Sequence, residues 1–526
     1  MPSPQAAITG FHDFARQQPG KLALVVEPGG RTASYGALDC LANQIAHALV
    51  ALGVREGDCI AACLPNDIPM VATILAAQRS GIYFTLLSPK ASASDLHYIA
   101  TDSGSRVLLV GDARTADQLD GLLQGACRVL VCHGSAEPPG AWERLVAAQP
   151  VQLPSNARPG MEMIYSSGTT GRPKGVRRDF HCKSWGEVDS RNVEAMRWLS
   201  GSPRSVYLST APLYHSAPYR LLCGFLDAGA TAVIMENFDA AASLELIDRH
   251  AVTHSSWVPT MFQRLLRLDP AARTGFSGRS MTHVVHGAAP CPVHVKHAMI
   301  GWWGPVLYEY YSGTEGIGRT FINSAEWLAH PGSVGKPSGC VAHILDDQGL
   351  ELPRGHVGNI YFESNVSFTY WNDPSKTRAS ESRQGWRTFG DIGYLDADGY
   401  LYLTDRKGFM VISGGVNIYP QEIENTLLEH PRVADAAVFG VPDEDLGEKL
   451  AAVVQLVDGA AGDTPTADEL FALCRSRGGG IKTPRLLRFC VDFPRGDTGK
   501  VQKRFLRDRI VQEPQPWPAT GTLPTA

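Results

Sequence analysis

Short apolar runs alternate with segments of helical periodicity near the start of the chain, and this alternation restricts the fold more than any other feature. The runs are residues 22–26, 59–64, 84–87, 107–110 and 129–132. Between the first two, leucine and isoleucine recur at spacings of three and four residues, with Ser34 as the expected N-cap and Gly53 as the expected end. Repeated strand–helix–strand units predict an α/β fold whose parallel sheet is covered on both faces and binds ligands at the carboxyl ends of its strands.

Length and charge exclude several classes of protein. At 526 residues the chain exceeds one hydrophobic core, and roughly 150 residues per domain gives three or four units. The 48 basic and 53 acidic residues leave a net charge of −5, so we expect no nucleic-acid partner.

No signal-peptide pattern and no run of about 18 apolar residues occurs, which predicts a cytoplasmic protein without a membrane span. The 11 cysteines include no Cys-x-x-Cys pair, so neither a disulfide framework nor a zinc site is expected.

A segment rich in glycine and hydroxyl groups follows the apolar residues before Tyr165. Its phosphate-binding candidates are Ser166, Ser167, Gly168, Thr169, Thr170 and Lys174. Glycine lets backbone N–H groups approach a ligand, the hydroxyls add donors, and lysine supplies a positive charge, so we predict a phosphate-binding loop. It is not a Walker A loop, because Pro173 stands five residues after Gly168 and no Ser or Thr follows Lys174. The alternative is a polar hairpin between two strands.

This segment resembles the phosphate loop of the adenylate-forming superfamily, which includes acyl-CoA synthetases, peptide-synthetase adenylation domains and firefly-type luciferases. Residues 286–290 (HGAAP), 308–316 (YEYYSGTEG) and 386–394 (WRTFGDIGY) resemble further motifs of that superfamily, at the expected distances. The resemblance implies an ATP site, to which it assigns Gly287, Ala288, Ala289, Tyr310, Tyr311, Ser312, Thr314, Glu315, Asp391 and Arg406.

The implied roles suit the residue types. The backbone at 287–289 would lie along the adenine and Tyr311 would stack on it, because a flat ring buries one face of a purine. Thr314 would contact the α-phosphate and Glu315 would bind Mg²⁺, a cation that prefers oxygen ligands. Asp391 would accept hydrogen bonds from both ribose hydroxyls, and Arg406 would also contact the ribose. Two residues depart from the usual pattern: Ser312 replaces a glycine and Phe389 replaces a threonine.

The acyl pocket implied by the resemblance is apolar. Its candidates are His215, Trp257, Thr260, Gly287 and Gly316. Residues 219–222 (YRLL) lack the aspartate with which amino-acid-activating relatives hold an ammonium group, so a hydrophobic acid is expected. An aryl, a fatty or an alicyclic acid would each fit. For a single residue such as His215 or Trp257, packing in the core is an equally physical interpretation.

A second specific stretch, residues 404–424, resembles the interdomain hinge of the superfamily, with the pivot at Gly408 and a surface for coenzyme A at Gly414 and Gly415. The nearby DADGY at 396–400 lacks the spacing of a calcium loop and predicts a hairpin turn. Lys500, in PRGDTGKVQK, matches the mobile catalytic lysine. The implied domains are a large ATP- and acyl-binding domain with doubly wound mixed sheets and a β-subdomain (1–405), a small mobile α+β domain (406–511) and a disordered tail (512–526).

These features predict an enzyme that uses ATP and Mg²⁺ to convert a hydrophobic carboxylic acid to an acyl-adenylate with release of pyrophosphate. Transfer of the acyl group to coenzyme A would follow. Transfer to an amine is the alternative, because the first half-reaction needs the same residues. A degenerate protein that only binds acyl-nucleotides is a third possibility, and the presence of Glu315, Asp391 and Lys500 argues against it.

Overall fold

The computed structural model describes residues 10–123, 125–132, 139–166, 173–178, 186, 190–414, 416–457, 462–495 and 501–513. The N-terminal part contains a five-stranded sheet in the order β6-β5-β3-β4-β7, in which every pair is parallel. Its strands are β3 (Cys59–Cys63), β4 (Tyr83–Leu86), β5 (Ser105–Val110), β6 (Arg128–Val131) and β7 (Met161–Glu162). The neighbouring helices are α2 (Tyr35–Ala51), α3 (Ile68–Ala77), α4 (Ala93–Asp102), α5 (Ala113–Leu123) and α6 (Ala141–Ala147).

Four of the five apolar runs are strands of this sheet, and the first is not. The run at 22–26 falls in β1 (Leu22–Glu27), which pairs with β11 and β2 of a second sheet. The predicted helix that follows is confirmed as α2, where the Ser34 hydroxyl accepts a hydrogen bond from the Ala37 N–H (3.2 Å). Periodicity therefore located these elements correctly, whereas the choice of sheet depended on pairing with residues more than 200 positions away.

The second sheet has 13 strands in the order β17-β18-β20-β21-β16-β15-β14-β13-β12-β10-β11-β1-β2. The strands not yet named are β2 (Arg31–Ser34), β10 (Val206–Ser209), β11 (Thr231–Met235), β12 (His254–Trp257), β13 (His283–His286), β14 (Leu307–Ser312), β15 (Arg319–Asn323), β16 (Ser333–Pro337), β17 (Val341–Leu345), β18 (Gly358–Glu363), β20 (Asp391–Leu395) and β21 (Leu401–Arg406). Pairs from β1 through β11, β10, β12 and β13 to β14 are parallel, and those from β14 onwards are antiparallel.

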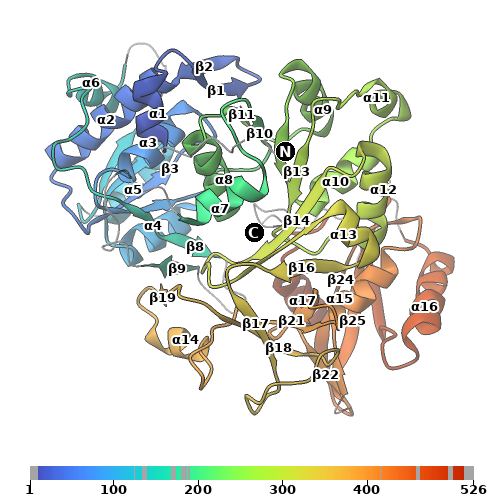
Figure 1. The fold of residues 1–526 in the computed structure, drawn as a ribbon. Helices are drawn as coiled ribbons and strands as arrows, with labels where there is room; N and C mark the ends of the chain where they lie inside the picture. Colours follow the sequence, from blue (N-terminus) through green and yellow to red (C-terminus); the bar gives the residue numbers. More distant parts are fainter. Residues whose placement is uncertain are drawn as a thin grey trace.

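Helices cover both faces of the parallel half of this sheet. They are α1 (Phe11–Gln17), α7 (Ser190–Trp198), α8 (Ser216–Asp227), α9 (Ala240–Arg249), α10 (Pro259–Leu266), α11 (Pro270–Gly275), α12 (Val293–Trp303) and α13 (Ser324–Ala329). One core joins α8 to α2, α3 and strands of both sheets, so α8 lies between the two sheets (Figure 1). Another core fills the space between the opposite face and helices α10 and α12. A three-stranded sheet, β8 (Ile164–Ser166), β9 (Lys174–Arg177) and β19 (Thr369–Tyr370), with helix α14 (Pro374–Ala379), completes this part.

The C-terminal elements form a separate sheet with its own cores. Its order is β23-β22-β25-β24, and β26 pairs with β25. The elements are β22 (Val411–Ser413), β23 (Val416–Ile418), α15 (Pro420–Leu427), β24 (Val433–Asp443), β25 (Gly447–Leu456), α16 (Thr464–Gly478), β26 (Leu486–Cys490) and α17 (Lys503–Gln512). One core packs α15 and α16 against the sheet and another packs α17 against it.

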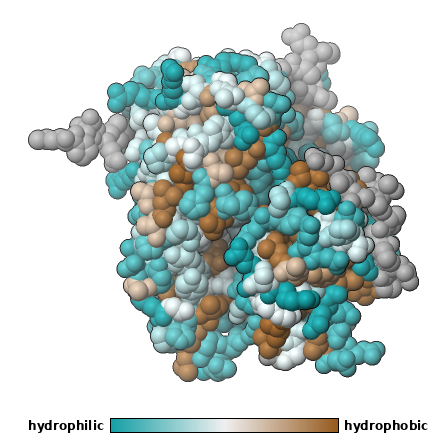
Figure 2. Space-filling model, turned by 90° about the vertical axis from the view of Figure 1, so that its right-hand side faces the viewer, coloured by the Kyte–Doolittle hydropathy of each residue, from teal (hydrophilic) through white to brown (hydrophobic). Residues whose placement is uncertain are grey.

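The exposed surface in Figure 2 is mostly polar, with apolar residues scattered among charged ones. No helix among the described residues is long and apolar enough to cross a membrane.

Candidate functional site

The predicted phosphate loop joins two antiparallel strands. Tyr165 of β8 pairs with Gly175 of β9, and Ser166 pairs with Lys174, so the loop connects two adjacent antiparallel strands. Ser167, Gly168, Thr169 and Thr170 lie outside the described residues, as does the side chain of Ser166. The base of the loop is anchored from helix α4, because the Tyr165 hydroxyl donates to Asp102 (2.5 Å).

Lys174 at the end of the loop has an acidic partner. Its Nζ lies 3.0 Å from Oδ2 of Asp373, the N-cap of α14. Hydrogen bonds from the Lys376 N–H, the Ser375 hydroxyl and Lys174 hold the pKa of Asp373 well below its usual range. The lysine is therefore fixed in place as a cation beside the loop.

The proposed adenine turn follows β13. A Cβ atom at Gly287 would lie 2.7 Å from the Tyr310 carbonyl oxygen and 2.8 Å from its ring, so only glycine fits at this position. Ala288 adopts a left-handed conformation with φ of 68°, which is unusual for a residue with a side chain. The turn and Tyr310 are thus in close contact.

A buried ion pair lies behind this turn. Lys296 of α12 is fully buried, and its Nζ lies 2.5 Å from Glu309 of β14. His286, which precedes Gly287, is also fully buried, with its Nε2 3.7 Å from the same carboxylate. Burial and the nearby Lys296 hold the pKa of His286 well below its ordinary value, so this ring is neutral. The pair connects α12 to the strand that carries the tyrosines.

Three residues predicted to contact adenine and ribose meet in space. The Tyr311 hydroxyl donates to Oδ2 of Asp391 (2.6 Å), and Arg406 Nε donates to Oδ1 (2.8 Å). Asp391 is 6% exposed, and its pairing with Arg406 along β20 and β21 fixes the arrangement. Burial, together with the adjacent Asp391, raises the pKa of Tyr311 well above its usual value, so its hydroxyl remains a donor.

Glu315 fits the predicted role of a magnesium ligand. It is 9% exposed, and its Oε1 accepts a hydrogen bond from the Tyr370 hydroxyl (2.6 Å). A Cβ atom at Gly313 would lie 2.7 Å from Oε2 and 2.4 Å from the Phe389 ring, so glycine leaves room for this carboxylate. An oxygen donor near the α-phosphate contact predicted for Thr314 suits a hard divalent cation.

The structure explains the two departures from the superfamily pattern. The Ser312 hydroxyl donates to the Gly318 carbonyl (2.7 Å) and so closes the turn. The Phe389 ring packs edge-on against Tyr311, with ring centroids 5.7 Å apart, and also contacts Phe362. Both substitutions therefore stabilise the surroundings of Tyr311. Gly316, which follows Glu315, has φ of 70°.

The acyl-pocket candidates fall on two faces of the sheet. His215 is the N-cap of α8 and contacts the Tyr214 ring at 4.5 Å. His254 and Ser256 of β12 face α8, because His254 contacts Phe225 and Ser256 bonds to Tyr207, which stacks on Phe225.

Trp257 therefore faces the opposite side, since side chains alternate along a strand. Its ring is enclosed by Phe238, Phe262 and Trp303. Core packing therefore accounts for the Trp257 side chain. Thr260, in the first turn of α10, is partly buried.

A buried cluster near Thr314 was missed from the sequence. Glu162 of β7 forms ion pairs with Arg178 and with Arg220 of α8. Arg220 also donates to the Thr314 carbonyl (3.0 Å). An acidic residue inside the apolar stretch 161–164 was the available signal, because a buried carboxylate requires a cationic partner.

The predicted pivot, Gly408, lies in the turn after β21, where the Phe409 N–H donates to the Arg406 carbonyl (2.9 Å). Lys503, at the start of α17, lies 2.6 Å from Glu424 and over the Phe409 ring. Burial raises the pKa of Glu424 to about 7 despite this pair. Gly414 has φ of 57°. Gly415 and Lys500 lie outside the described residues.

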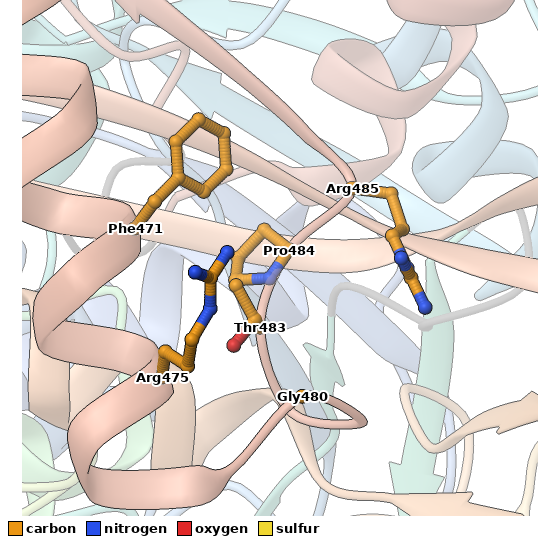
Figure 3. Close-up of a pocket in the computed structure, with 6 residues that line it drawn as sticks. All are labelled: Phe471, Arg475, Gly480, Thr483, Pro484 and Arg485. Carbon is orange, nitrogen blue, oxygen red and sulfur yellow. The ribbon is translucent and has the colours of Figure 1, made fainter.

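The C-terminal sheet carries a pocket of about 420 Å³ at the end of α16. Arg475 extends from the helix toward Pro484 and Thr483, and Arg485 lies on the other side of this segment (Figure 3). Both arginines are exposed residues, and the Arg485 side chain points away from Phe471 and Arg475 (Figure 3). Exposed guanidinium groups bind phosphate readily.

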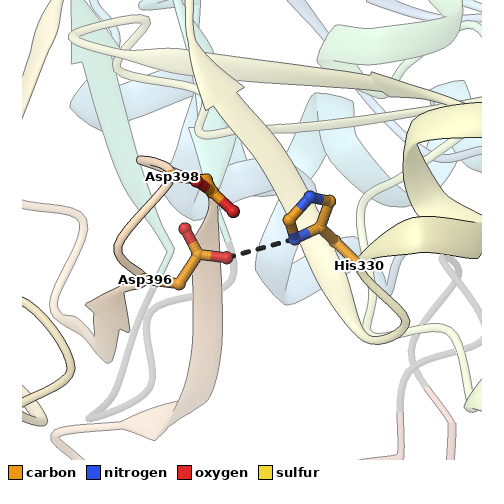
Figure 4. A group of neighbouring side chains, drawn as sticks. All are labelled: His330, Asp396 and Asp398. Atoms are coloured by element: carbon orange, nitrogen blue, oxygen red, sulfur yellow. Dashed lines mark ion pairs between the residues drawn. The ribbon is translucent and has the colours of Figure 1, made fainter.

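The hairpin predicted at 396–400 is confirmed, because the Asp396 carboxylate accepts the Tyr400 N–H (2.8 Å) between β20 and β21. Asp396 also pairs with His330 (3.2 Å), and Asp398 lies beside them (Figure 4).

Two protein families match the chain: AMP-binding enzyme over residues 11–371, and the C-terminal domain of the AMP-binding enzymes over residues 422–500. The chain belongs to the AMP-binding enzyme family. A feruloyl-CoA synthase from Amycolatopsis sp is 32% identical over 492 residues, which cover 93% of this enzyme and 96% of the relative.

Solved structures of similar proteins agree with this assignment. ATP-bound MatB from Rhodopseudomonas palustris has a TM-score of 0.84 and 28% identity, covering 95% of this enzyme and 99% of that chain. The amide bond synthetase McbA from Marinactinospora thermotolerans has a TM-score of 0.79 and 27% identity over the same shares of the two chains. These findings confirm the predicted superfamily and fold class.

Proposed function

We propose that the enzyme activates a hydrophobic carboxylic acid with ATP and then transfers the acyl group to coenzyme A. The observation that carries this proposal is the convergence of Tyr311 and Arg406 on the buried Asp391. Glu315 follows Tyr311 by four residues and interacts electrostatically with both Tyr311 and Arg406. This arrangement offers a ring for adenine, a carboxylate for ribose and an oxygen ligand for Mg²⁺. The similarity to a feruloyl-CoA synthase supports the same activity.

Activation is needed because a carboxylate is a poor electrophile. In the first half-reaction an oxygen of the acid forms a bond to the α-phosphorus of ATP while the bond to pyrophosphate breaks, giving an acyl-adenylate. Such a step is promoted mainly by positioning and by stabilising negative charge. Lys174 and the loop that precedes it would hold the outer phosphates. Glu315 would hold Mg²⁺, which neutralises part of the charge on the phosphates when bound.

Lys500 would complete the first half-reaction by binding the carboxylate and the α-phosphate. Rotation of the C-terminal domain about Gly408 would then withdraw it and present the surface at Gly414 and Gly415 to the thiol. The ion pair of Lys503 with Glu424 supports this proposal, because it ties the segment after Lys500 to the domain that would rotate.

Coenzyme A is favoured as the acceptor by the pocket at Arg475 and Arg485, because a simple amine carries no phosphate for these guanidinium groups to bind. The likeness to an amide bond synthetase keeps the amine acceptor as a second candidate. The described cysteines are free thiols, which supports a reducing, cytoplasmic location. Cell fractionation tests that location, and recovery outside the cytoplasm would refute it.

The deciding experiment is a panel of aryl, fatty and alicyclic acids, scored by pyrophosphate release with and without coenzyme A. We expect release with at least one class and a thioester when coenzyme A is present, identified by mass. An amide formed from supplied amines, without any thioester, would favour the second candidate. No release with any acid would refute the activity.

Lys500→Ala tests the exchange between half-reactions. We expect loss of adenylate formation, while supplied acyl-adenylate is still converted to thioester. Equal loss of both steps would contradict the rotation.

A further inference from the structure

Two arginines share one carboxylate at the junction of α8 and the phosphate-loop strands. Glu162, 6% exposed, pairs with Arg178 and also accepts from Arg220 through Nη2 (3.0 Å) and Nε (3.2 Å). Both guanidinium groups therefore lie beside one buried carboxylate, and Arg220 also reaches the Thr314 carbonyl.

Arg220 is the member of the cluster that an additional anion can reach. Its side chain is 24% exposed, compared with 5% for Arg178 and 7% for Glu162. Glu162 and the Thr314 carbonyl occupy its Nε and Nη2 donors. A guanidinium has five N–H donors, so the two on Nη1 are available, and no acceptor among the described residues takes them.

The position of Arg220 matches the place where the reacting acid must lie. It is on α8, which His215 caps, and it contacts the carbonyl of Thr314, which precedes the magnesium ligand candidate. It is also near enough to Tyr310 to lower the pKa of that phenol, although burial raises this pKa more, to about 12. The guanidinium therefore belongs to the helix that His215 caps and lies beside the residue that precedes Glu315.

We propose that Arg220 binds the carboxylate of the acid substrate through Nη1 and holds it beside Thr314 for attack on the α-phosphorus. This inference rests on the proposed function. Both reactants are anions, so a fixed cation lowers the repulsion between them, and arginine binds carboxylates in a defined orientation. In the step itself a carboxylate oxygen bonds to phosphorus and pyrophosphate leaves with the electron pair of the broken P–O bond. No proton is transferred.

A purely structural role for Arg220 predicts a different result. If it only tied α8 to Glu162 and Thr314, its loss would weaken the binding of charged and neutral ligands alike. If it binds the carboxylate, its loss weakens the acid selectively. The primary amide of the same acid has nearly the same shape and no charge, so it separates the two roles.

The test begins with an acid that the wild-type enzyme activates, and compares the affinities for that acid and its amide by calorimetry. For Arg220→Gln we expect acid affinity to fall about 10- to 100-fold and amide affinity to change less than about threefold. Arg220→Lys keeps the positive charge, so its affinity for the acid should fall less than that of Arg220→Gln. Tyr219→Phe is the matched control, because it removes another contact with Glu162 (3.3 Å) without changing charge, and should leave both affinities unchanged.

Arg220→Gln should fold, because Glu162 keeps Arg178 as a partner. Equal losses for acid and amide, or no loss for the acid, would overturn the proposal for Arg220. If Arg220→Gln does not fold, the affinities of Arg220→Lys for the acid and the amide are compared instead. Equal changes in these two affinities would overturn the proposal. If the wild type activates no acid, the proposed function fails and this inference fails with it.

Discussion

Asp391→Asn should weaken ATP binding and remove the preference of the enzyme for a ribose over a deoxyribose. Arg406 and Tyr311 already donate to the two oxygens of Asp391, at 2.8 and 2.6 Å. A carboxylate has about four lone-pair sites, so about two remain for the ribose hydroxyls. Hydrogen bonds to a charged group contribute about 1.5–3 kcal/mol each. The amide loses the charge and one acceptor, and we expect the KM for ATP to rise about 100-fold.

The assay is exchange of labelled pyrophosphate into ATP, with KM determined for ATP and for 2′-deoxy-ATP. The wild type should favour ATP by about tenfold or more, because the deoxynucleotide lacks one hydroxyl bonded to the carboxylate. In Asp391→Asn this ratio should fall toward one. Asp347→Asn is the matched control: it removes an exposed aspartate paired with Lys407 (2.9 Å) and should behave as wild type. A ratio in Asp391→Asn equal to that of the wild type would refute the ribose assignment.

Three further predictions concern the acceptor pocket, the buried ion pair and the pH dependence of stability. Replacing Arg475 and Arg485 by alanine should raise the KM for coenzyme A about tenfold and leave pyrophosphate exchange unchanged; an unchanged KM would argue against a phosphate site. Lys296→Met should lower the unfolding free energy in urea by about 3–5 kcal/mol, because Glu309 is left buried without a cation. Combining it with Glu309→Gln should recover part of this loss. Additive losses of unfolding free energy in the double variant would contradict this account. Burial lowers the pKa of His254 to about 4, so the unfolded chain takes up a proton below about pH 6.5 that the folded protein does not. This histidine therefore destabilises the fold as the pH falls from 6.5 to 4, by about 1.4 kcal/mol per pH unit. The unfolding free energy in urea should fall more steeply over this range in the wild type than in His254→Gln. Parallel curves of unfolding free energy against pH for the two proteins would disprove this account.

Local patterns predicted the elements well, and the structure shows why. Helix α2 formed where apolar residues recur at helical spacing after a capping serine, and β3 to β6 formed from short apolar runs. Both signals arise from neighbours in sequence. The run at 22–26 belongs to another sheet because β1 pairs with β11. Composition does not specify which distant strand a buried strand will pair with.

The site residues show the same limit. Tyr311, Asp391 and Arg406 were found by resemblance, and the structure brings their side chains together across 80 and 15 residues of sequence. The resemblance assigned Trp257 to the acyl pocket, whereas the alternation of β12 places its side chain in the core on the face opposite to His254 and Ser256. Arg220 was noted only as replacing an aspartate, because its partnership with Glu162 depends on contact between α8 and β7.

The resting partners of the ATP-site residues have a consequence for selectivity. Lys174 pairs with Asp373, and Glu315 accepts a hydrogen bond from Tyr370. On the proposed roles, a phosphate group would replace Asp373 beside Lys174, and Mg²⁺ would replace the Tyr370 hydroxyl at Glu315. Given those roles, a nucleotide with more negative charge and a bound divalent cation would replace these partners more readily than a nucleoside or a monophosphate would.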